Sequence, residues 1–318
     1  MTRYFLFLML ALAGFAGRAQ TVAISSNSVI SFASLDEARQ IITNRDSFLA
    51  AQSPFDRAAR LQTDRDVPPE EFRDFLGTNV MAWQPYDTNR LIPIFEGIRQ
   101  KLEPWHLPFP TNILLVKTTG KEEFESYYTR QNAIICPAVP LTRPSADIFV
   151  HELFHVLSRQ NPELRARLYG MLGFQRINDV VAPAAFEQRK ITNPDGIQNG
   201  WRITVTNAGS ALEVVPTIYI PAGVLSSRFG NPIPYFRLME VENAGGTWSP
   251  KLADGQPHLL TSGNAAGYRE QIGRNTGYII HPDEILADNF VLLINHATNA
   301  PTPRILDEMR RILADPRN

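Results

Sequence analysis

The five residues from His151 to His155, which read H-E-x-x-H, constrain this chain more than any other part of it. They lie in a stretch predicted to be helical from Ser145 to about Arg159, and positions i and i+4 of a helix share a face. Both imidazoles therefore point the same way. The neighbouring residues are mostly apolar, which predicts a buried helix, and burying two imidazoles and the Glu152 carboxylate without partners would cost several kcal/mol. We expect this helix to form one wall of a site.

The chemistry that fits this pattern is zinc-assisted hydrolysis. His151 and His155 can bind zinc through ring nitrogens, and zinc lowers the pKa of a bound water towards about 7. Glu152 lies one step along the helix, where it can take a proton from that water as general base without binding the metal. Three alternatives stay open: a chance match on a surface helix, core histidines with satisfied hydrogen bonds, and a degenerate metal site.

A catalytic zinc site needs a third protein ligand, and no histidine follows His155 closely enough to provide it. A helix predicted from Pro282 to Asn295 carries Glu284 and Asp288 four residues apart, on one face. We expect Glu284 to bind zinc and Asp288 to accept the free N–H of a ligating histidine. His281 is the competing ligand, but it precedes a proline, which disfavours helical geometry there. The alternative for this segment is an amphipathic surface helix with scattered acids.

H-E-x-x-H followed downstream by E-x-x-x-D resembles the gluzincin zinc metallopeptidases, the thermolysin-like branch of the zincins. The resemblance covers the motif helix, the strands before it and the Glu284 helix, which together are under half of the chain. It implies that the two motif histidines and Glu284 bind zinc, with Glu152 as general base and Asp288 as partner of a ligand histidine. It also implies that residues 132–136 form an edge strand that lines the cleft and pairs with an extended peptide. The segment between the two ligand helices is much longer than in familiar members, so an insertion must lie there.

A hydrolase of this kind also needs a hydrogen-bond donor for the oxyanion, usually a tyrosine or histidine. Tyr278 is our first choice because it stands just before the Glu284 helix. The other candidates are Tyr268, Tyr169, His258 and His296.

The first 19 residues have the three-part design of a cleaved secretory signal peptide. Arg3 gives a positive start, residues 4–15 are almost entirely apolar, and Gly17 and Ala19 are small residues at the −3 and −1 positions of a cut before Gln20. The apolar run is short for a membrane span; a buried helix or a membrane anchor is the alternative. We expect an exported chain, in a bacterial periplasm or outside the cell, with no stable membrane insertion after the signal is removed.

The rest of the chain divides into three segments, and together they predict an α+β fold with a zincin-like catalytic domain. Residues 20–172 combine N-terminal helices, a small sheet and the H-E-x-x-H helix. Residues 173–275 are rich in Gly, Pro, Asn and Thr and carry short β runs, which predicts a β-rich insertion. Residues 276–318 form C-terminal helices that bring the third zinc ligand. Strands are expected at 112–117, 132–136, 201–205, 213–220 and 235–241, and helices from 34 to 103, at 145–159, 163–172, 282–295 and 303–313.

Composition narrows the function further. The 31 basic and 32 acidic residues give a net charge of −1, which excludes a strongly basic nucleic-acid binder. The single cysteine, Cys136, excludes an intramolecular disulfide and any zinc site built from cysteines. Our prediction is an exported zinc-dependent metallopeptidase acting on a peptide or protein substrate. The alternatives are a non-catalytic exported binding protein on a zincin scaffold and a zinc hydrolase of another amide, such as one in peptidoglycan.

Overall fold

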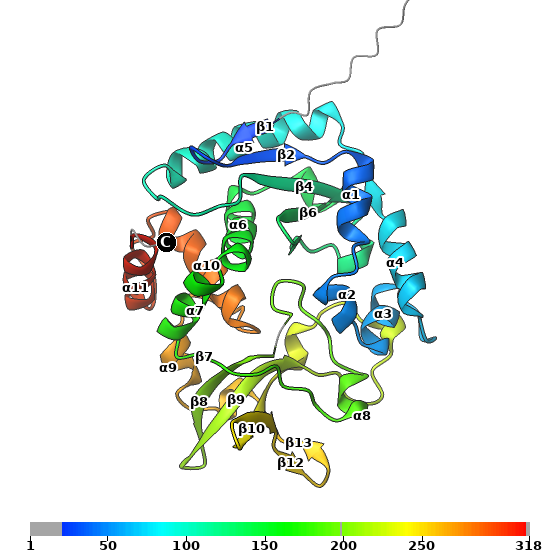
Figure 1. Cartoon of the computed structure of the whole chain (residues 1–318), viewed down its shortest axis with the longest axis vertical. Helices are drawn as coiled ribbons and strands as arrows, with labels where there is room; N and C mark the ends of the chain where they lie inside the picture. Colours follow the sequence, from blue (N-terminus) through cyan, green and yellow to red (C-terminus); the bar gives the residue numbers. More distant parts are fainter. Residues whose placement is uncertain (1–20, 198, 316–318) are drawn as a thin grey trace, which may run out of the picture.

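A six-stranded sheet forms the upper part of the molecule in Figure 1. The structure is a computed structural model that describes residues 21–197 and 199–315, so the expected signal peptide lies outside the described residues. Strands β2, β4 and β6 run parallel, while β1 and β5 are the antiparallel edges of the path β1-β2-β4-β6-β5 and β3 pairs with β4. The strands span Thr21–Ala23 (β1), Val29–Phe32 (β2), Val80–Met81 (β3), Asn112–Thr118 (β4), Tyr128–Arg130 (β5) and Ala133–Pro137 (β6).

The expectation that residues 132–136 form the edge strand is wrong. Strand β6 pairs with β4 on one side, with Lys117 opposite Cys136, and with β5 on the other, with Thr129 opposite Ile134. The edge strand is therefore β5, which folds back onto β6 through a tight turn where Gln131 has φ 53°. A three-residue strand is too short to show alternation in the sequence, so only the pairing reveals it.

The N-terminal helices were predicted from capping residues and apolar spacing, and the structure confirms helices in this region. Ser34 caps the first one by accepting from the Glu37 N–H, and the Glu37 side chain accepts in return from the Ser34 N–H. Strands β1 and β2, which precede this helix, were not predicted. The helices span Leu35–Ile42 (α1), Ser47–Ala51 (α2), Pro54–Arg60 (α3), Pro69–Thr78 (α4) and Pro85–Leu102 (α5).

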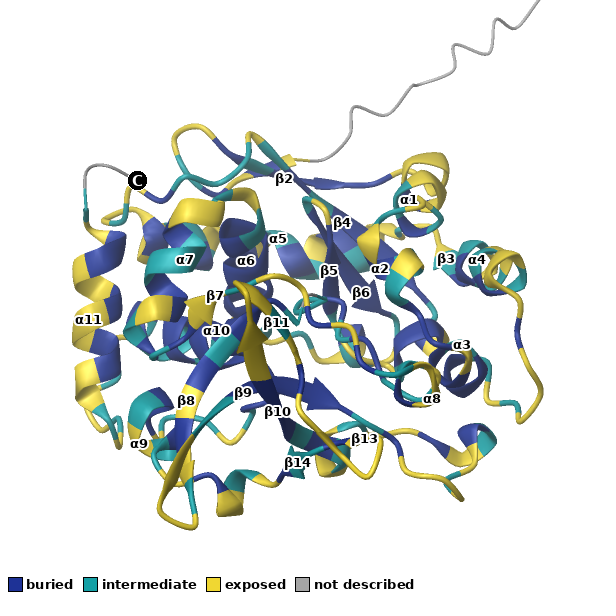
Figure 2. Cartoon of the chain, turned by 60° about the horizontal axis from the view of Figure 1, so that its bottom comes forward, coloured by how far each residue is buried: buried dark blue, intermediate teal, exposed yellow. Residues whose placement is uncertain are grey.

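Helix α6 (Ala146–Gln160) carries the H-E-x-x-H motif and is buried along most of its length (Figure 2). Its N-cap is Ser145, as the sequence predicted, and every residue from Phe149 to Ser158 is buried. It packs against β5, β6 and α5 and, along one face, against α10 (Pro282–Ile294). Helices α7 (Pro162–Met171) and α11 (Pro303–Leu313) complete this group, and α11 keeps one face exposed.

Residues 173–275 form a second, mainly antiparallel sheet in the lower part of Figure 1, as the composition of this segment predicted. Its order is β11-β10-β9-β8-β7, with β14 beside β10 and a separate β12–β13 pair. The strands span Gln175–Arg176 (β7), Trp201–Asn207 (β8), Ser210–Ile218 (β9), Phe236–Ala244 (β10), Thr247–Pro250 (β11), Leu252–Ala253 (β12), Gln256–Pro257 (β13) and Leu259–Leu260 (β14), and the helices span Ala184–Glu187 (α8) and Tyr268–Ile272 (α9).

Short 3-10 turns connect several of these elements. They span Lys121–Glu123 (η1), Pro140–Thr142 (η2), Ser226–Arg228 (η3), Ile233–Tyr235 (η4) and Ser262–Asn264 (η5). Within residues 21–197 and 199–315, no helix combines the length and the apolar character that crossing a membrane requires.

Candidate metal centre

Helices α6 and α10 bring three donor atoms together, although residues 173–275 separate the two helices in the sequence. His151 Nε2 lies 3.1 Å from Glu284 Oε2, and His155 Nε2 lies 3.4 Å from the same oxygen. Bond lengths of about 2.0–2.2 Å and tetrahedral angles place zinc ligands roughly 3.3–3.5 Å apart. Two imidazole nitrogens and one carboxylate oxygen at these separations therefore fit a zinc ion.

The outer nitrogen of each imidazole faces its own carboxylate. His151 Nδ1 lies 2.9 Å from Asp288 Oδ1, the pairing that the sequence predicted, and His155 Nδ1 lies 2.7 Å from Asp283 Oδ2. When each Nδ1–H donates to its carboxylate, each Nε2 keeps a lone pair directed at Glu284. Nitrogen lone pairs that face a carboxylate oxygen repel it, so either a proton or a metal cation is required at this point.

The charge balance of the buried site leads to the same requirement. Burial by itself lowers the pKa of His151, but the hydrogen bonds to Asp288 and Glu284 outweigh it and raise this pKa to about 10. Burial also opposes ionisation of Glu284, yet the charges of His155 and His151 hold its pKa well below its usual range. The carboxylates thus demand positive charge on or between the imidazoles, which protons or a divalent cation can supply.

Glu152 faces the same region with a free oxygen. Glu152 is 2% exposed, and its Oε2 has no hydrogen-bond partner among the described residues. Burial, followed by the nearby carboxylate of Asp195, raises the pKa of Glu152 to about 8. A divalent cation at the neighbouring donors would lower this value. A buried carboxylate oxygen without a partner is costly, so Oε2 is available to a ligand or a water molecule.

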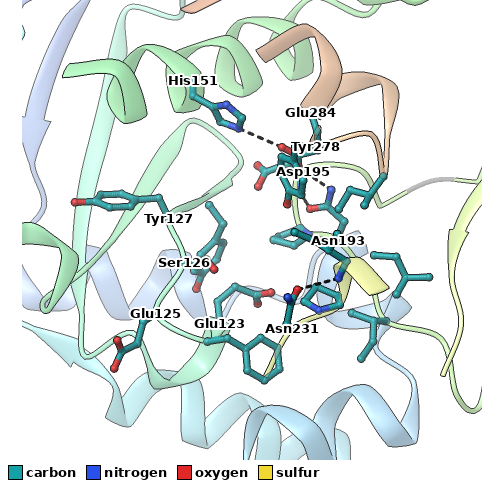
Figure 3. A pocket seen from close by; sticks show the side chains of 18 of the residues that line it. Glu123, Glu125, Ser126, Tyr127, His151, Asn193, Asp195, Asn231, Tyr278 and Glu284 are labelled. Carbon is teal, nitrogen blue, oxygen red and sulfur yellow. Dashed lines mark hydrogen bonds and ion pairs between the residues drawn. The ribbon is translucent and has the colours of Figure 1, made fainter. Parts of the chain in front are cut away.

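A cavity of about 510 Å³ opens onto these residues (Figure 3). His151 and Glu284 lie at one end in this view, and Glu123 and Asn231 lie at the other. The lining comes from the start of β5 and the segment before it, from α6, from α10 and the segment before it, and from two loops and the end of β9 in the insertion. The cavity therefore lies between helices α6 and α10 and the segment of residues 173–275.

Tyr278, the first choice for oxyanion donor, lines this cavity and stacks on the His151 ring with centroids 6.5 Å apart. Burial raises its pKa well above the usual range, so its hydroxyl stays protonated and can donate. The four other candidates do not line the cavity. Tyr268 donates to the Ile279 carbonyl, Tyr169 to Asp283, His258 pairs with Glu240, and His296 is exposed.

His281 is the N-cap of α10 and stands outside the cavity. Its Nδ1 accepts a hydrogen bond from the Asp283 N–H at 3.2 Å, which requires an unprotonated nitrogen. Burial lowers its pKa to about 4, consistent with a neutral ring. The structure thus places Glu284, and not His281, beside the two motif histidines.

Three residues of the site were not found from the sequence. Asp283 holds His155 and also accepts from Ser158 Oγ at 2.5 Å and from the Tyr169 hydroxyl at 2.7 Å. Asn193 and Asp195 belong to the insertion and reach the site from far along the chain. Asp283 could have been suspected because it is the acid next to the expected ligand, whereas nothing in the sequence around the other two residues indicates a role.

Comparisons with family models, with curated proteins and with solved structures found no match for this chain.

Proposed function

We propose that this protein is a zinc-dependent hydrolase that cleaves peptide bonds. The observation that carries the proposal is one arrangement: two imidazole Nε2 atoms and Glu284 Oε2 converge, and the unpartnered Glu152 Oε2 faces the same cavity. Separate carboxylates hold the two imidazoles in place. A structural metal site has no need of a buried carboxylate oxygen without a partner beside it, which favours catalysis over a purely structural role.

Zinc bound at these donors would supply Lewis acidity and would lower the pKa of a water molecule towards neutrality. Glu152 is the residue that takes the proton from the water and returns it to the leaving nitrogen. Tyr278 keeps its proton and offers a hydroxyl to the negative charge that develops on the carbonyl oxygen. The low exposure of Glu152 and His155 keeps bulk water away from these groups.

An extended peptide fits the edge of the upper sheet. Strand β5 leaves one side unpaired, but Asp195 Oδ1 accepts the outward N–H of Thr129 at 3.0 Å, so that position is occupied. Backbone groups alternate in direction along an antiparallel edge, so Tyr127 is the next outward position and it lines the cavity. A substrate strand paired at Tyr127 would pass beside the metal-ligand helices.

Export is part of the proposal and rests on the first 19 residues of the sequence. Cleavage there would make Gln20 the mature N-terminus, free or cyclised. Mass spectrometry of protein secreted by a bacterial host tests this, and secreted protein that still carries residues 1–19 would point to an anchor.

The deciding experiment combines metal analysis with hydrolysis. The purified protein should contain about one zinc per chain by elemental analysis and cleave quenched peptides, and a chelator should abolish cleavage until zinc is restored. Glu152→Gln should keep its zinc while hydrolysis falls at least about 10²-fold, the scale of a lost general base. The matched control is Glu96→Gln, which makes the same change at an exposed position of α5 and should keep the activity of the wild type.

The possible results separate the candidate functions. Zinc without hydrolysis of peptides would favour a binding protein, and hydrolysis of peptidoglycan amides alone would favour the other amide class. A Glu152→Gln variant as active as wild type would overturn the proposed mechanism.

A further inference from the structure

The turn formed by Asn193, Pro194 and Asp195 joins the insertion to the metal-ligand helices. Asn193 Nδ2 donates to Glu284 Oε1 at 2.7 Å, while Glu284 Oε2 faces the two histidines. We infer that this turn is a positioning element of the metal centre, in which Asn193 orients Glu284 so that a single oxygen is presented to the metal. This inference rests on the metal site of the proposed function and gives the insertion a role within it.

At its Asp195 end, the turn is fixed to strand β5 and helix α6. Asn193 Oδ1 accepts the Asp195 N–H at 3.0 Å, which closes the turn. Asp195 Oδ1 then accepts from the Thr129 N–H, the Thr129 hydroxyl and Arg159 Nη2. Thr129 belongs to β5 and Arg159 to α6, so the turn is tied to the edge strand and to the motif helix at once.

The residue before the turn is tied to the N-terminal helices. The Thr192 N–H donates to Asp56 Oδ2 at 2.9 Å, and Arg60 Nη2 donates to the Thr192 carbonyl at 3.1 Å. All three side chains are buried, and Arg60 also bonds Glu123. Buried, charge-assisted hydrogen bonds of this kind hold a segment in one geometry.

The residue after the turn allows it to approach α10 closely. A Cβ built on Gly196 would lie 2.4 Å from Cγ of His281, the N-cap of α10. Only glycine fits against a buried ring at this separation. The segment from Thr192 to Gly196 is thus held on both sides, and Asn193 is the side chain that it delivers to Glu284.

The test replaces the Asn193 Nδ2 donor by an acceptor oxygen, through the variant Asn193→Asp. Asn193→Asp keeps the oxygen that closes the turn but places a carboxylate oxygen against Glu284 Oε1, where two acceptors repel. We expect the dissociation constant for zinc to rise roughly 10- to 100-fold, the usual effect of losing a partner of a metal ligand. The visible absorption of the cobalt-substituted protein should also change, because it reports ligand geometry directly and a distant structural defect would leave it unaltered.

The matched control is Asn231→Asp, which adds the same charge to the same cavity. Asn231 Oδ1 closes its own turn by accepting the Ile233 N–H at 3.0 Å, and the aspartate can do the same. This variant should keep the zinc affinity and the cobalt spectrum of the wild type. Asn193→Ala removes the donor without adding a charge, and it replaces Asn193→Asp in these measurements if that variant does not fold.

The outcomes separate this inference from the proposed function. If wild type binds zinc but cleaves no peptide, the proposed function fails while the affinity and spectral shifts of Asn193→Asp still decide the inference. If Asn193→Asp and Asn193→Ala both match wild type in zinc affinity and cobalt spectrum, the inference is wrong, whatever the activity. A wild type that binds no zinc overturns both.

Discussion

Asp283 Oδ2 lies 2.7 Å from His155 Nδ1. Asp283 directly precedes Glu284, one expected metal ligand, and it orients His155, which is another. Burial opposes ionisation of Asp283, but the hydrogen bond and charge of His155 hold its pKa below the usual range. The second orienting acid, Asp288, is one-third exposed, whereas Asp283 is almost fully buried. The two pairs therefore differ in how strongly solvent weakens them.

This difference predicts the ranking of two matched variants. The partners of the Asp283 carboxylate all donate hydrogen bonds to it, and Asp283→Asn would place an NH₂ group, itself a donor, among them. His155 would then be held less well, so zinc affinity should fall roughly 10- to 100-fold. Asp288→Asn should cost less, because water can solvate its altered side chain. Competition with a chromogenic chelator measures both constants. A larger loss in Asp288→Asn would show that burial does not set the ranking.

Glu284→Ala should lose most of its zinc, and His281→Ala should keep it. The reason is geometric: the Glu284 carboxylate meets both motif histidines, while the His281 ring caps α10 and lies against Tyr169. Elemental analysis of the two purified variants measures this. His281→Ala should still lose about 1 kcal/mol of folding stability with its cap. Zinc lost only from His281→Ala would mean that the third ligand is assigned wrongly.

Tyr278→Phe should lower kcat roughly 10²-fold, the scale of one lost oxyanion donor, without lowering the zinc content. Tyr127→Phe is the control, because this second tyrosine also lines the cavity and its hydroxyl has no partner within the described part of the chain. It should keep the kcat of the wild type. If Tyr127→Phe were the slow variant, the donor would be Tyr127.

Cleavage should be faster for peptides that carry lysine or arginine near the scissile bond than for the same peptides with glutamate. The described cavity lining contains no lysine or arginine, and Glu125, an exposed residue of that lining, forms no ion pair with any described residue. A preference of about 1 kcal/mol, or roughly fivefold in kcat/KM, is expected. Glu125→Gln and added salt should each reduce this difference in kcat/KM between the two peptides. Equal kcat/KM values for both peptides at low salt would contradict this expectation.

The buried Glu122 should make the protein less stable as pH rises from about 4.5 to 7. Burial raises the pKa of Glu122 to about 7 from the ordinary 4.5, so in this window the folded chain holds a proton that the unfolded chain has released. The loss is complete above pH 7 and is on the order of 3 kcal/mol.

Urea unfolding of the zinc-free protein at several pH values measures this effect. Glu122→Gln should match wild type near pH 4.5 and exceed it at pH 8, whereas the exposed Glu96→Gln should match wild type throughout. A constant difference between Glu122→Gln and wild type across the range would show that Glu122 does not titrate as its burial requires.

Local sequence determined the helices that carry the site. Ser145 caps α6, and the apolar residues around the motif allow burial on nearly every side, so the position of α6 and the shared face of its two histidines follow from capping and periodicity. The four-residue spacing of Glu284 and Asp288 follows from the same periodicity on α10. These features depend on residues within one or two helical turns, and the sequence alone therefore predicted them.

The tertiary structure alone determined which side chains and strands lie against helices α6 and α10. Asn193 reaches Glu284 across 91 positions and Asp283 reaches His155 across 128, distances at which no local periodicity carries information. The edge strand was assigned to the wrong run because strand order depends on pairing and not on the apolar character of any one strand. Long-range packing selects each partner, since a buried polar group must be satisfied by whichever side chains the fold brings beside it.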